Sequence, residues 1–328
     1  LVSEQTVIEA VRATLQSEMR RDGSVIVLGE DVGSRGGVFL ATDGLIDEFG
    51  ENRVIDTPLA ESSICGVALG AAVNGFRPIA EIQFADFVWP AINQLVGEAS
   101  KVRYGTNGVK AAPMTVRIPY GGGVRGGLYH SQSIEVLFSH TPGLFVVAPA
   151  TPYDAKGLLA TAIRTDDPVI VLEHKRTYRL VKGDVPDEDY TIPIGKAEIK
   201  RPGTDMTIVT YGLMLHYSLQ AAEMAAVNGI DVEVIDLRTL RPLDEDAIAE
   251  SASRTGKALI VQEDTPAVSI SSEVAAIIGE RCFFDLDGPI TRLGPPELPP
   301  MPFSPIQEAA FMPSPEKILA AITKLSEI

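Results

Sequence analysis

Apolar residues form two patterns along the first half of the chain. Near the start, Val7, Val11 and Leu15 are spaced four residues apart, which predicts a helix that ends before Gly23. Further on, short uninterrupted apolar runs alternate with longer stretches. The runs predict buried strands over residues 25–28, 79–82, 114–118, 144–147 and 169–172. The longer stretches predict helices over residues 62–73, 87–104 and 152–164. Short apolar strands between helices are typical of a parallel sheet that helices cover on both faces.

A second series of the same kind follows a stretch rich in glycine and proline. Residues 183–203 contain three glycines and three prolines, which predicts a connection between domains. Beyond it the pattern predicts strands over residues 207–211, 232–235 and 259–261 and helices over residues 218–227, 245–253, 272–279 and 315–325. We therefore expect an α/β protein with two parallel-sheet domains, residues 1–185 and 204–328, joined by a linker over residues 186–203.

Composition and charge limit the kinds of molecule that this protein is expected to bind. The chain has 328 residues, of which 45% are hydrophobic and 22% charged, as in an ordinary globular protein long enough for two cores. Its net charge of −16 argues against nucleic acid or an anionic membrane as the main partner. Most of the excess negative charge lies in residues 204–328, which contain 19 acidic and 8 basic residues. No run of 18 apolar residues occurs, so we expect a cytoplasmic protein, or one of the mitochondrial matrix in a eukaryote.

Several common catalytic motifs are absent or incomplete. Cys65 and Cys282 form no CxxC pair and are expected to be reduced, buried thiols. The chain has no Walker motif, no HExxH and no GxSxG, and its four histidines lack ligand spacing, which disfavours a zinc site or a serine hydrolase. Residues 121–127 contain a GxGxxG match, but no helix is predicted to begin on these glycines. We interpret them as a flexible loop that lets backbone approach a ligand or a neighbouring chain.

The remaining candidates are polar and aromatic residues at strand ends. Glu61 lies directly before the helix predicted over residues 62–73, and a glutamate at the start of a helix often serves only as a helix-dipole partner. Gln83 and Phe87 follow the strand over residues 79–82, at the edge where open α/β sheets usually bind ligands, although a lone phenylalanine is more often a core residue. His130 follows the glycine-rich loop and is a candidate general acid or base.

Taken together, these segments resemble one family. The matching motifs lie at residues 29–32, 36–39, 56–61 (DTPLAE), 81–87 (EIQFADF), 117–123, 129–133 (YHSQS), 149–157 and 236–244. They look like the β subunit of the 2-oxo acid dehydrogenases, in the thiamine-diphosphate-dependent decarboxylating component of the branched-chain and pyruvate complexes. The resemblance implies a transketolase-like pyrimidine-binding domain followed by a transketolase C-terminal domain.

The resemblance also implies that the chain is half of an enzyme. The family forms a heterotetramer of two α and two β subunits, active only when both are present, with cofactor sites between them. The α subunit holds the diphosphate and its Mg²⁺ through a Gly-Asp-Gly motif, and this chain contains no Gly-Asp-Gly. The β subunits dock the basic peripheral subunit-binding domain of the lipoyl acyltransferase core, and the acidic residues 204–328 fit such a partner.

Individual residues carry over from the family motifs. Glu61 matches the glutamate that binds N1′ of the aminopyrimidine, and Leu59 and Gln83 match residues that line this ring. Phe87 matches the aromatic residue that stacks on it, and His130 matches a histidine implicated in substrate handling and in acyl transfer to lipoyl.

Many relatives bind a potassium ion, and this chain departs from their sequence pattern at that site. Residues 165–167 read Thr-Asp-Asp where the family usually has Asp-x-Asn, so potassium is doubtful. Thr115, Thr165 and Asp167 are the weak candidates for its ligands.

The substrate and the class of enzyme stay open at this point. Residues 38–39, 83–86 and 128–133 resemble the branched-chain type, which favours 3-methyl-2-oxobutanoate, with pyruvate as the alternative. A split transketolase-type enzyme and a non-catalytic assembly subunit are the lower-ranked possibilities.

Overall fold

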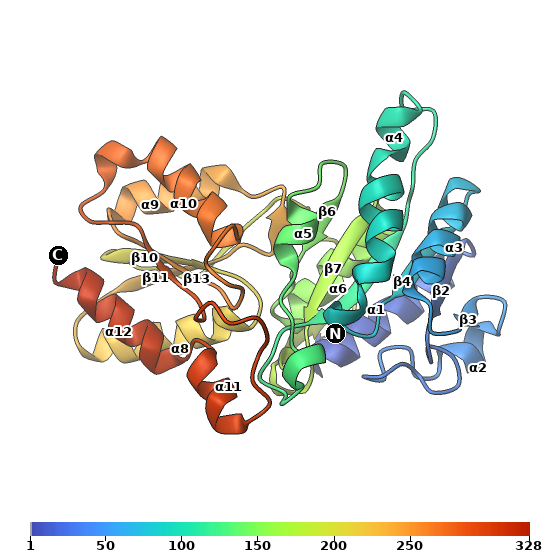
Figure 1. The fold of residues 1–328 in the computed structure, drawn as a ribbon, viewed down its shortest axis with the longest axis horizontal. Helices are drawn as coiled ribbons and strands as arrows, with labels where there is room; N and C mark the ends of the chain where they lie inside the picture. The colour runs from blue at the N-terminus through green and yellow to red at the C-terminus, as the bar shows by residue number, and fades with distance from the viewer. Residues whose placement is uncertain (1) are drawn as a thin grey trace. The chain divides into compact units, whose positions relative to one another are not determined.

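The computed structural model describes residues 2–328, which form two compact units (Figure 1). The first unit comprises the chain up to Tyr120 together with Leu137–Ile194. The second comprises Gly121–Val136 and Gly195–Ile328. The glycine-rich loop therefore groups with the second half of the chain, which its position in the sequence did not indicate. The domain limits 1–185 and 204–328 stay a proposal.

The first unit is built on a parallel sheet. Its strands lie side by side in the order β6-β7-β5-β4-β2-β3, and each neighbouring pair is parallel. The strands are β2 (Val25–Gly29), β3 (Val54–Asp56), β4 (Arg77–Glu81), β5 (Thr115–Tyr120), β6 (Phe145–Val147) and β7 (Val169–His174). Most of their side chains are buried, which explains why they read as apolar runs. The strands predicted from these runs are confirmed, with ends that differ by up to two residues.

Helices flank this sheet. They are α1 (Val7–Arg21), α2 (Leu45–Phe49), α3 (Glu61–Val73), α5 (Glu135–Ser139), α6 (Pro152–Arg164) and α7 (Thr177–Leu180). Thr6 and Glu9 form a capping box at the start of α1, and the apolar face of this helix packs beside α6. The structure adds an antiparallel pair, β1 (Val2–Thr6) with β8 (Lys182–Pro186). Both strands carry several exposed or half-buried residues, so no apolar run predicted them.

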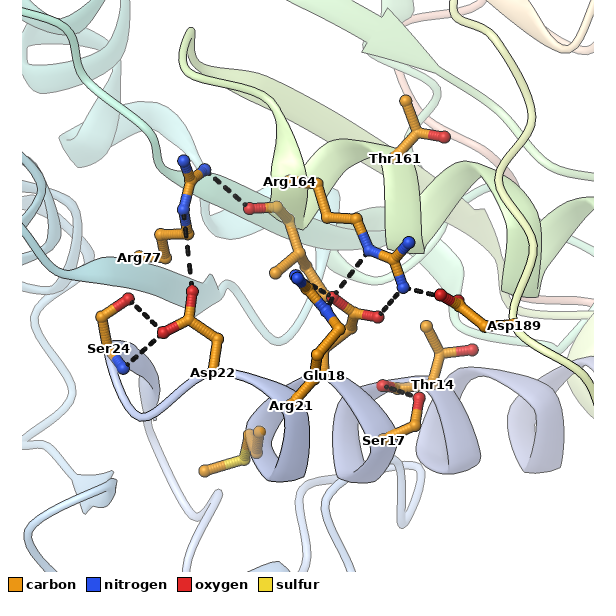
Figure 2. A network of polar contacts seen from close by, with 12 residues as sticks. Thr14, Ser17, Glu18, Arg21, Asp22, Ser24, Arg77, Thr161, Arg164 and Asp189 are labelled. Carbon is orange, nitrogen blue, oxygen red and sulfur yellow. Dashed lines mark hydrogen bonds and ion pairs between the residues drawn. The ribbon is translucent and has the colours of Figure 1, made fainter.

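A polar network fixes the contact between α1 and α6 (Figure 2). The carboxylate of Glu18 is 2% exposed and accepts hydrogen bonds from Arg164, at 2.5 and 3.1 Å, and from Arg21, at 2.7 and 2.9 Å. Arg164 also pairs with Asp189 at 2.5 Å. A buried carboxylate with two guanidinium partners fixes one register between the helices.

The helix predicted over residues 87–104 is interrupted. Short 3₁₀ turns at Ala85–Phe87 and Trp89–Ala91 lead into a π-helical segment, Asn93–Glu98, and then a third 3₁₀ turn, Ala99–Lys101. The coil ends in α4 (Val102–Gly105; Figure 1). Pro90 has no N–H to donate within the coil, which is one physical reason why regular α-helical bonding does not run through it.

The second unit contains a smaller sheet with the strand order β14-β13-β10-β11-β9. The pairs among β10 (Met206–Thr210), β11 (Val232–Asp236), β13 (Ala258–Val261) and β14 (Thr291–Leu293) are parallel. The edge strand β9 (Glu198–Arg201) is antiparallel to β11 and lies inside the range predicted as a linker. Both sheets are thus mainly parallel, and the predicted α/β class is confirmed.

Helices cover this second sheet as well. They are α8 (Leu213–Val227), α9 (Glu245–Thr255), α10 (Ile270–Arg281), α11 (Pro305–Phe311) and α12 (Pro315–Ser326), and a short strand β12 (Thr239–Arg241) follows β11. The terminal helix α12 packs against α8. Cys65 and Cys282 are both buried and unpaired, as predicted. No helix within residues 2–328 is both long enough and apolar enough to cross a membrane.

Candidate active site

The predicted cofactor residues gather at one edge of the first sheet. Strand β2 lies between β3 and β4, and Gly29 is in register with both Asp56 and Glu81. The carboxyl ends of these parallel strands therefore meet at one edge. The chain segments that leave this edge carry Leu59, Glu61, Gln83 and Phe87.

Backbone contacts fix the segment that leads to Glu61. The N–H of Gly33 donates to the Asp56 carboxylate at 2.6 Å, and the N–H of Thr57 donates to the carbonyl of Gly29 at 2.9 Å. A Cβ on Gly33 would lie 2.4 Å from an oxygen of Asp56, so only glycine allows this approach. These contacts join the loop after β3 to the loop after β2.

Glu61 is the first residue of α3 and is 8% exposed. Its carboxylate accepts no hydrogen bond and forms no ion pair with any residue of the described chain. Burial raises the pKa of the neighbouring Glu30 carboxyl, and the charges of Asp31 and then Glu61 raise it further. A nearly buried carboxylate without a partner is costly unless a ligand or another chain donates to it.

The neighbouring candidates have distinct surroundings. Leu59 is 68% exposed, which is unusual for a leucine, and Gln83 donates to the carbonyl of Glu30 at 3.4 Å. The ring of Phe87 is half-buried and meets the ring of Phe84 edge-on at 5.5 Å. Together with Glu61, these groups offer an acceptor, an amide, an aliphatic surface and an aromatic face. This set suits a planar heteroaromatic ring whose nitrogen donates a hydrogen bond.

A buried ion network lies at the same edge of the sheet. Arg117 on β5 forms two hydrogen bonds to Glu173 on β7, at 2.8 and 2.6 Å, and one to Glu81 on β4, at 2.6 Å. The hydroxyl of Tyr178 donates to Glu173 at 2.5 Å. Burial raises the pKa of Glu81, while Arg117 opposes this shift. The sequence analysis used Glu81 and Arg117 only as parts of a family motif and did not assign them this role.

His130 belongs to the second unit. It follows a short turn, Gly127–Tyr129, and is half-buried. The N–H of Gly121 donates to the carbonyl of Gln132 at 3.0 Å, which closes the base of the glycine-rich loop that carries the histidine. No helix of eight or more residues begins on these glycines, in agreement with the rejection of a dinucleotide motif.

A buried acidic group lies just beyond His130. Glu135 is fully buried, and neither carboxylate oxygen has a described hydrogen-bond partner of good geometry. Burial raises the pKa of Glu135 well above its usual range, and the charges of Asp264 and Glu263 raise it further. Burial also raises the pKa of Asp264 to about 6. Sequence reasoning missed this group because its members are far apart along the chain.

Two of the three weak potassium candidates make contacts with other side chains or backbone groups of the chain. Thr115 is buried on β5, and the hydroxyl of Thr165 donates to the carbonyl of Thr161 at 2.7 Å. Asp167 pairs with Arg103 at 2.5 Å, which already balances its charge. Within residues 2–328, no group of three or more histidine, cysteine, aspartate or glutamate residues is placed to hold a metal ion.

Comparison with known proteins identifies the family to which this chain belongs. The transketolase pyrimidine-binding domain family matches residues 3–181, and the transketolase C-terminal domain family matches residues 195–318. The chain is 58% identical over 326 residues to the β subunit of 2-oxoisovalerate dehydrogenase from Bacillus subtilis, covering 99% of this chain and 100% of the relative. The chain belongs to the β subunits of the 2-oxo acid dehydrogenases.

Further relatives of this β subunit support the same family. It is 47% identical over 326 residues to the β subunit of the first component of pyruvate dehydrogenase from Bacillus subtilis, again covering 99% and 100% of the two chains. The counterpart from Staphylococcus epidermidis is 47% identical over 292 residues, which are 89% of this chain and 90% of the relative. A solved split-gene transketolase, described as an inactive tetramer of β chains, shares the fold with a TM-score of 0.77, 22% identity and 98% coverage of each chain. The resemblance inferred from the motifs is confirmed, and the family depends on thiamine diphosphate.

The buried acidic group gives a pH-dependent prediction. We expect Glu135→Gln to stabilise this β subunit more at pH 8 than at pH 5. The raised pKa of Glu135 means that the unfolded chain binds fewer protons above the ordinary glutamate pKa, so folded stability falls as pH rises through this range. Glutamine cannot ionise and removes that loss. Each kcal/mol regained corresponds to about 2–4 °C in melting temperature for a domain of this size.

Melting curves at both pH values measure this effect. Glu250→Gln is the control, because Glu250 is exposed on α9 and should show no pH-dependent difference from the wild type. An equal gain at both pH values, or a loss at pH 8, would contradict the raised pKa of Glu135.

Proposed function

We propose that this β subunit holds the pyrimidine end of thiamine diphosphate and acts with an α subunit in the oxidative decarboxylation of 3-methyl-2-oxobutanoate. The observation that supports the cofactor assignment best is the carboxylate of Glu61, which is 8% exposed and has no partner within the described chain. A ring nitrogen that donates a hydrogen bond would remove the cost of burying this group.

The residues at this edge fit the cofactor. When bound, thiamine diphosphate supplies an electron sink for decarboxylation. Glu61 would accept a hydrogen bond at N1′ and hold the ring in the protonation state that this chemistry needs. Phe87 would stack on the ring, and Leu59 and Gln83 would line it. The Mg²⁺ and the diphosphate would be held mainly by the α subunit, and nothing described in this chain supports a potassium ion.

His130 would serve a second step. An imidazole side chain can both donate and accept a proton, which suits it to a general acid or base role. We propose that it assists substrate handling and acyl transfer to the lipoyl group of the acyltransferase.

The Glu61→Gln variant tests the cofactor assignment. We expect it to keep its assembly with the α subunit and most of its cofactor affinity, because glutamine fills the same volume. The rate should fall by at least about two orders of magnitude, the usual contribution of a positioned acid or base. The assay measures decarboxylation by the αβ complex at saturating thiamine diphosphate. Glu51→Gln, at an exposed turn position, serves as the control, and a near-normal rate for Glu61→Gln would disprove the role of Glu61.

The preferred substrate follows from the relatives and from the sequence features of the branched-chain type. Identity is 58% to the 2-oxoisovalerate enzyme and 47% to the pyruvate enzymes. We expect kcat/KM for 3-methyl-2-oxobutanoate to exceed that for pyruvate by about tenfold or more, since small differences in apolar bulk give discrimination of this size. Steady-state assays of the αβ complex measure both constants. A tenfold preference for pyruvate would assign the chain to the pyruvate complex instead.

The acidic second half supports an acyltransferase partner. Asp285, Asp287 and Glu327 are all exposed in the second unit. If a basic subunit-binding domain docks on this charge, binding should weaken at least several-fold between low salt and about 0.5 M salt, where screening is strong. Reversing the three charges should weaken binding further without changing decarboxylation measured with an artificial acceptor. Salt-independent binding would show that the charge serves only solvation.

A further inference from the structure

Two glutamates of the second unit bind the backbone of the glycine-rich loop. The N–H of Gly122 donates to Glu263 at 2.5 Å. The N–H groups of Gly123 and Arg125 donate to one oxygen of Glu308, at 3.0 and 3.1 Å. Glu263 follows β13 and Glu308 lies on α11, and they are only 5% and 6% exposed. Three backbone N–H groups of this loop are therefore bound by carboxylates that are distant in sequence.

The loop has a conformation that needs such support. Gly121, Gly123, Arg125 and Gly127 all have positive φ angles, of 83°, 75°, 60° and 64°. Arginine rarely adopts this left-handed region, so contacts outside the loop must stabilise Arg125 there. The Glu308 carboxylate accepts from the N–H of Arg125 itself. The strained backbone conformation and the hydrogen bond that stabilises it therefore both lie at Arg125.

Close packing links the loop to His130. A Cβ on Gly126 would lie 2.5 Å from the carbonyl oxygen of His130, and a Cβ on Gly127 would lie 2.9 Å from the ring of Phe303. The contact between Gly126 and the backbone of His130 leaves no free space between them. A shift of the loop at Gly123 or Arg125 would therefore be passed on to the histidine.

We propose that Glu308 is a positioning residue that keeps His130 in one place by holding the backbone of Gly123 and Arg125. This inference rests on the role proposed above for His130. The carboxylate is suited to the task because one oxygen accepts two N–H groups, and bonds to a charged acceptor are stronger than neutral ones. Glutamine keeps an oxygen at this position, whereas alanine leaves both N–H groups without this partner.

Three variants of the β subunit in its complex with the α subunit test the proposal. They are Glu308→Ala, Glu308→Gln and the control Glu250→Ala, whose glutamate is exposed on α9 and has no described partner. Hydrogen exchange of the loop amides, read from peptides that cover residues 121–127, reports directly on the two bonds. Trypsin cleavage after Arg125 reports on the mobility of the same loop, and steady-state assays with a lipoyl-domain acceptor report kcat and KM.

Glu308→Ala should accelerate exchange and trypsin cleavage in the loop by about tenfold or more, the effect expected from losing bonds to a charged acceptor. It should lower kcat by about tenfold to a hundredfold with a smaller change in KM, because misplacing a catalytic group by about 1 Å costs up to this factor. Glu308→Gln should recover most of each effect. Glu250→Ala should behave as the wild type.

Two results would overturn the proposal. One is unchanged loop exchange and unchanged trypsin cleavage in Glu308→Ala. The other is faster exchange throughout the second unit with equal defects in the alanine and glutamine variants, which would show a general structural role. A His130→Ala variant separates the two hypotheses: full acyl transfer in that variant would refute the proposed role of His130, while the exchange data would still show whether Glu308 holds the loop.

Discussion

The buried contact of Arg117 with Glu173 and Glu81 holds together the edge of the sheet on which the rest of the site depends. It joins the middle of β5 to the carboxyl ends of β4 and β7 through three hydrogen bonds of 2.6–2.8 Å. Removing either partner would leave an uncompensated charge in the interior, which is among the most destabilising changes a core can undergo. The network therefore holds these three strands together, and two of the residues proposed to bind the cofactor follow β4 in the chain.

Along the chain, the strands of this network lead directly into segments that carry candidate residues. Glu81 is the last residue of β4, and Gln83 and Phe87 follow within six residues. Strand β5 ends at Tyr120, and the glycine-rich loop begins at the next residue. A Cβ on Gly37 would lie 3.0 Å from an oxygen of Glu81, so the loop after β2 also packs on this carboxylate. Arg117 thus supports the cofactor edge through packing, without needing to touch a ligand.

The sequence predicted those parts of the fold whose burial is continuous. The strands of the first sheet are buried almost throughout, and an uninterrupted apolar run of four to six residues is their direct consequence. Strands β1, β8 and β9 were not predicted because they carry many exposed or half-buried residues. Strands β3, β12 and β14 were not predicted either, because their three residues do not form a recognisable apolar run. The gathering of Glu61 and Gln83 was predictable because parallel strands bring their carboxyl ends together. The contact of Glu308 with Gly123 was not, because 185 residues separate the two and no local pattern records such a pairing.

Four buried glutamates of this chain differ in the groups that donate hydrogen bonds to them, and this difference helps to distinguish structural from functional roles. Glu18 and Glu173 each accept bonds from arginine, and both are explained by the fold alone. Glu308 accepts two backbone N–H groups, so its charge stabilises a strained loop rather than a helix contact. Glu61 is as well buried as Glu308 but has no donor in the described chain. An unpaired buried carboxylate lowers stability unless its pKa rises, as at Glu135, or a donor reaches it from outside the chain. We propose that Glu61 is such a case, and that its donor would arrive with the cofactor in a shared active site.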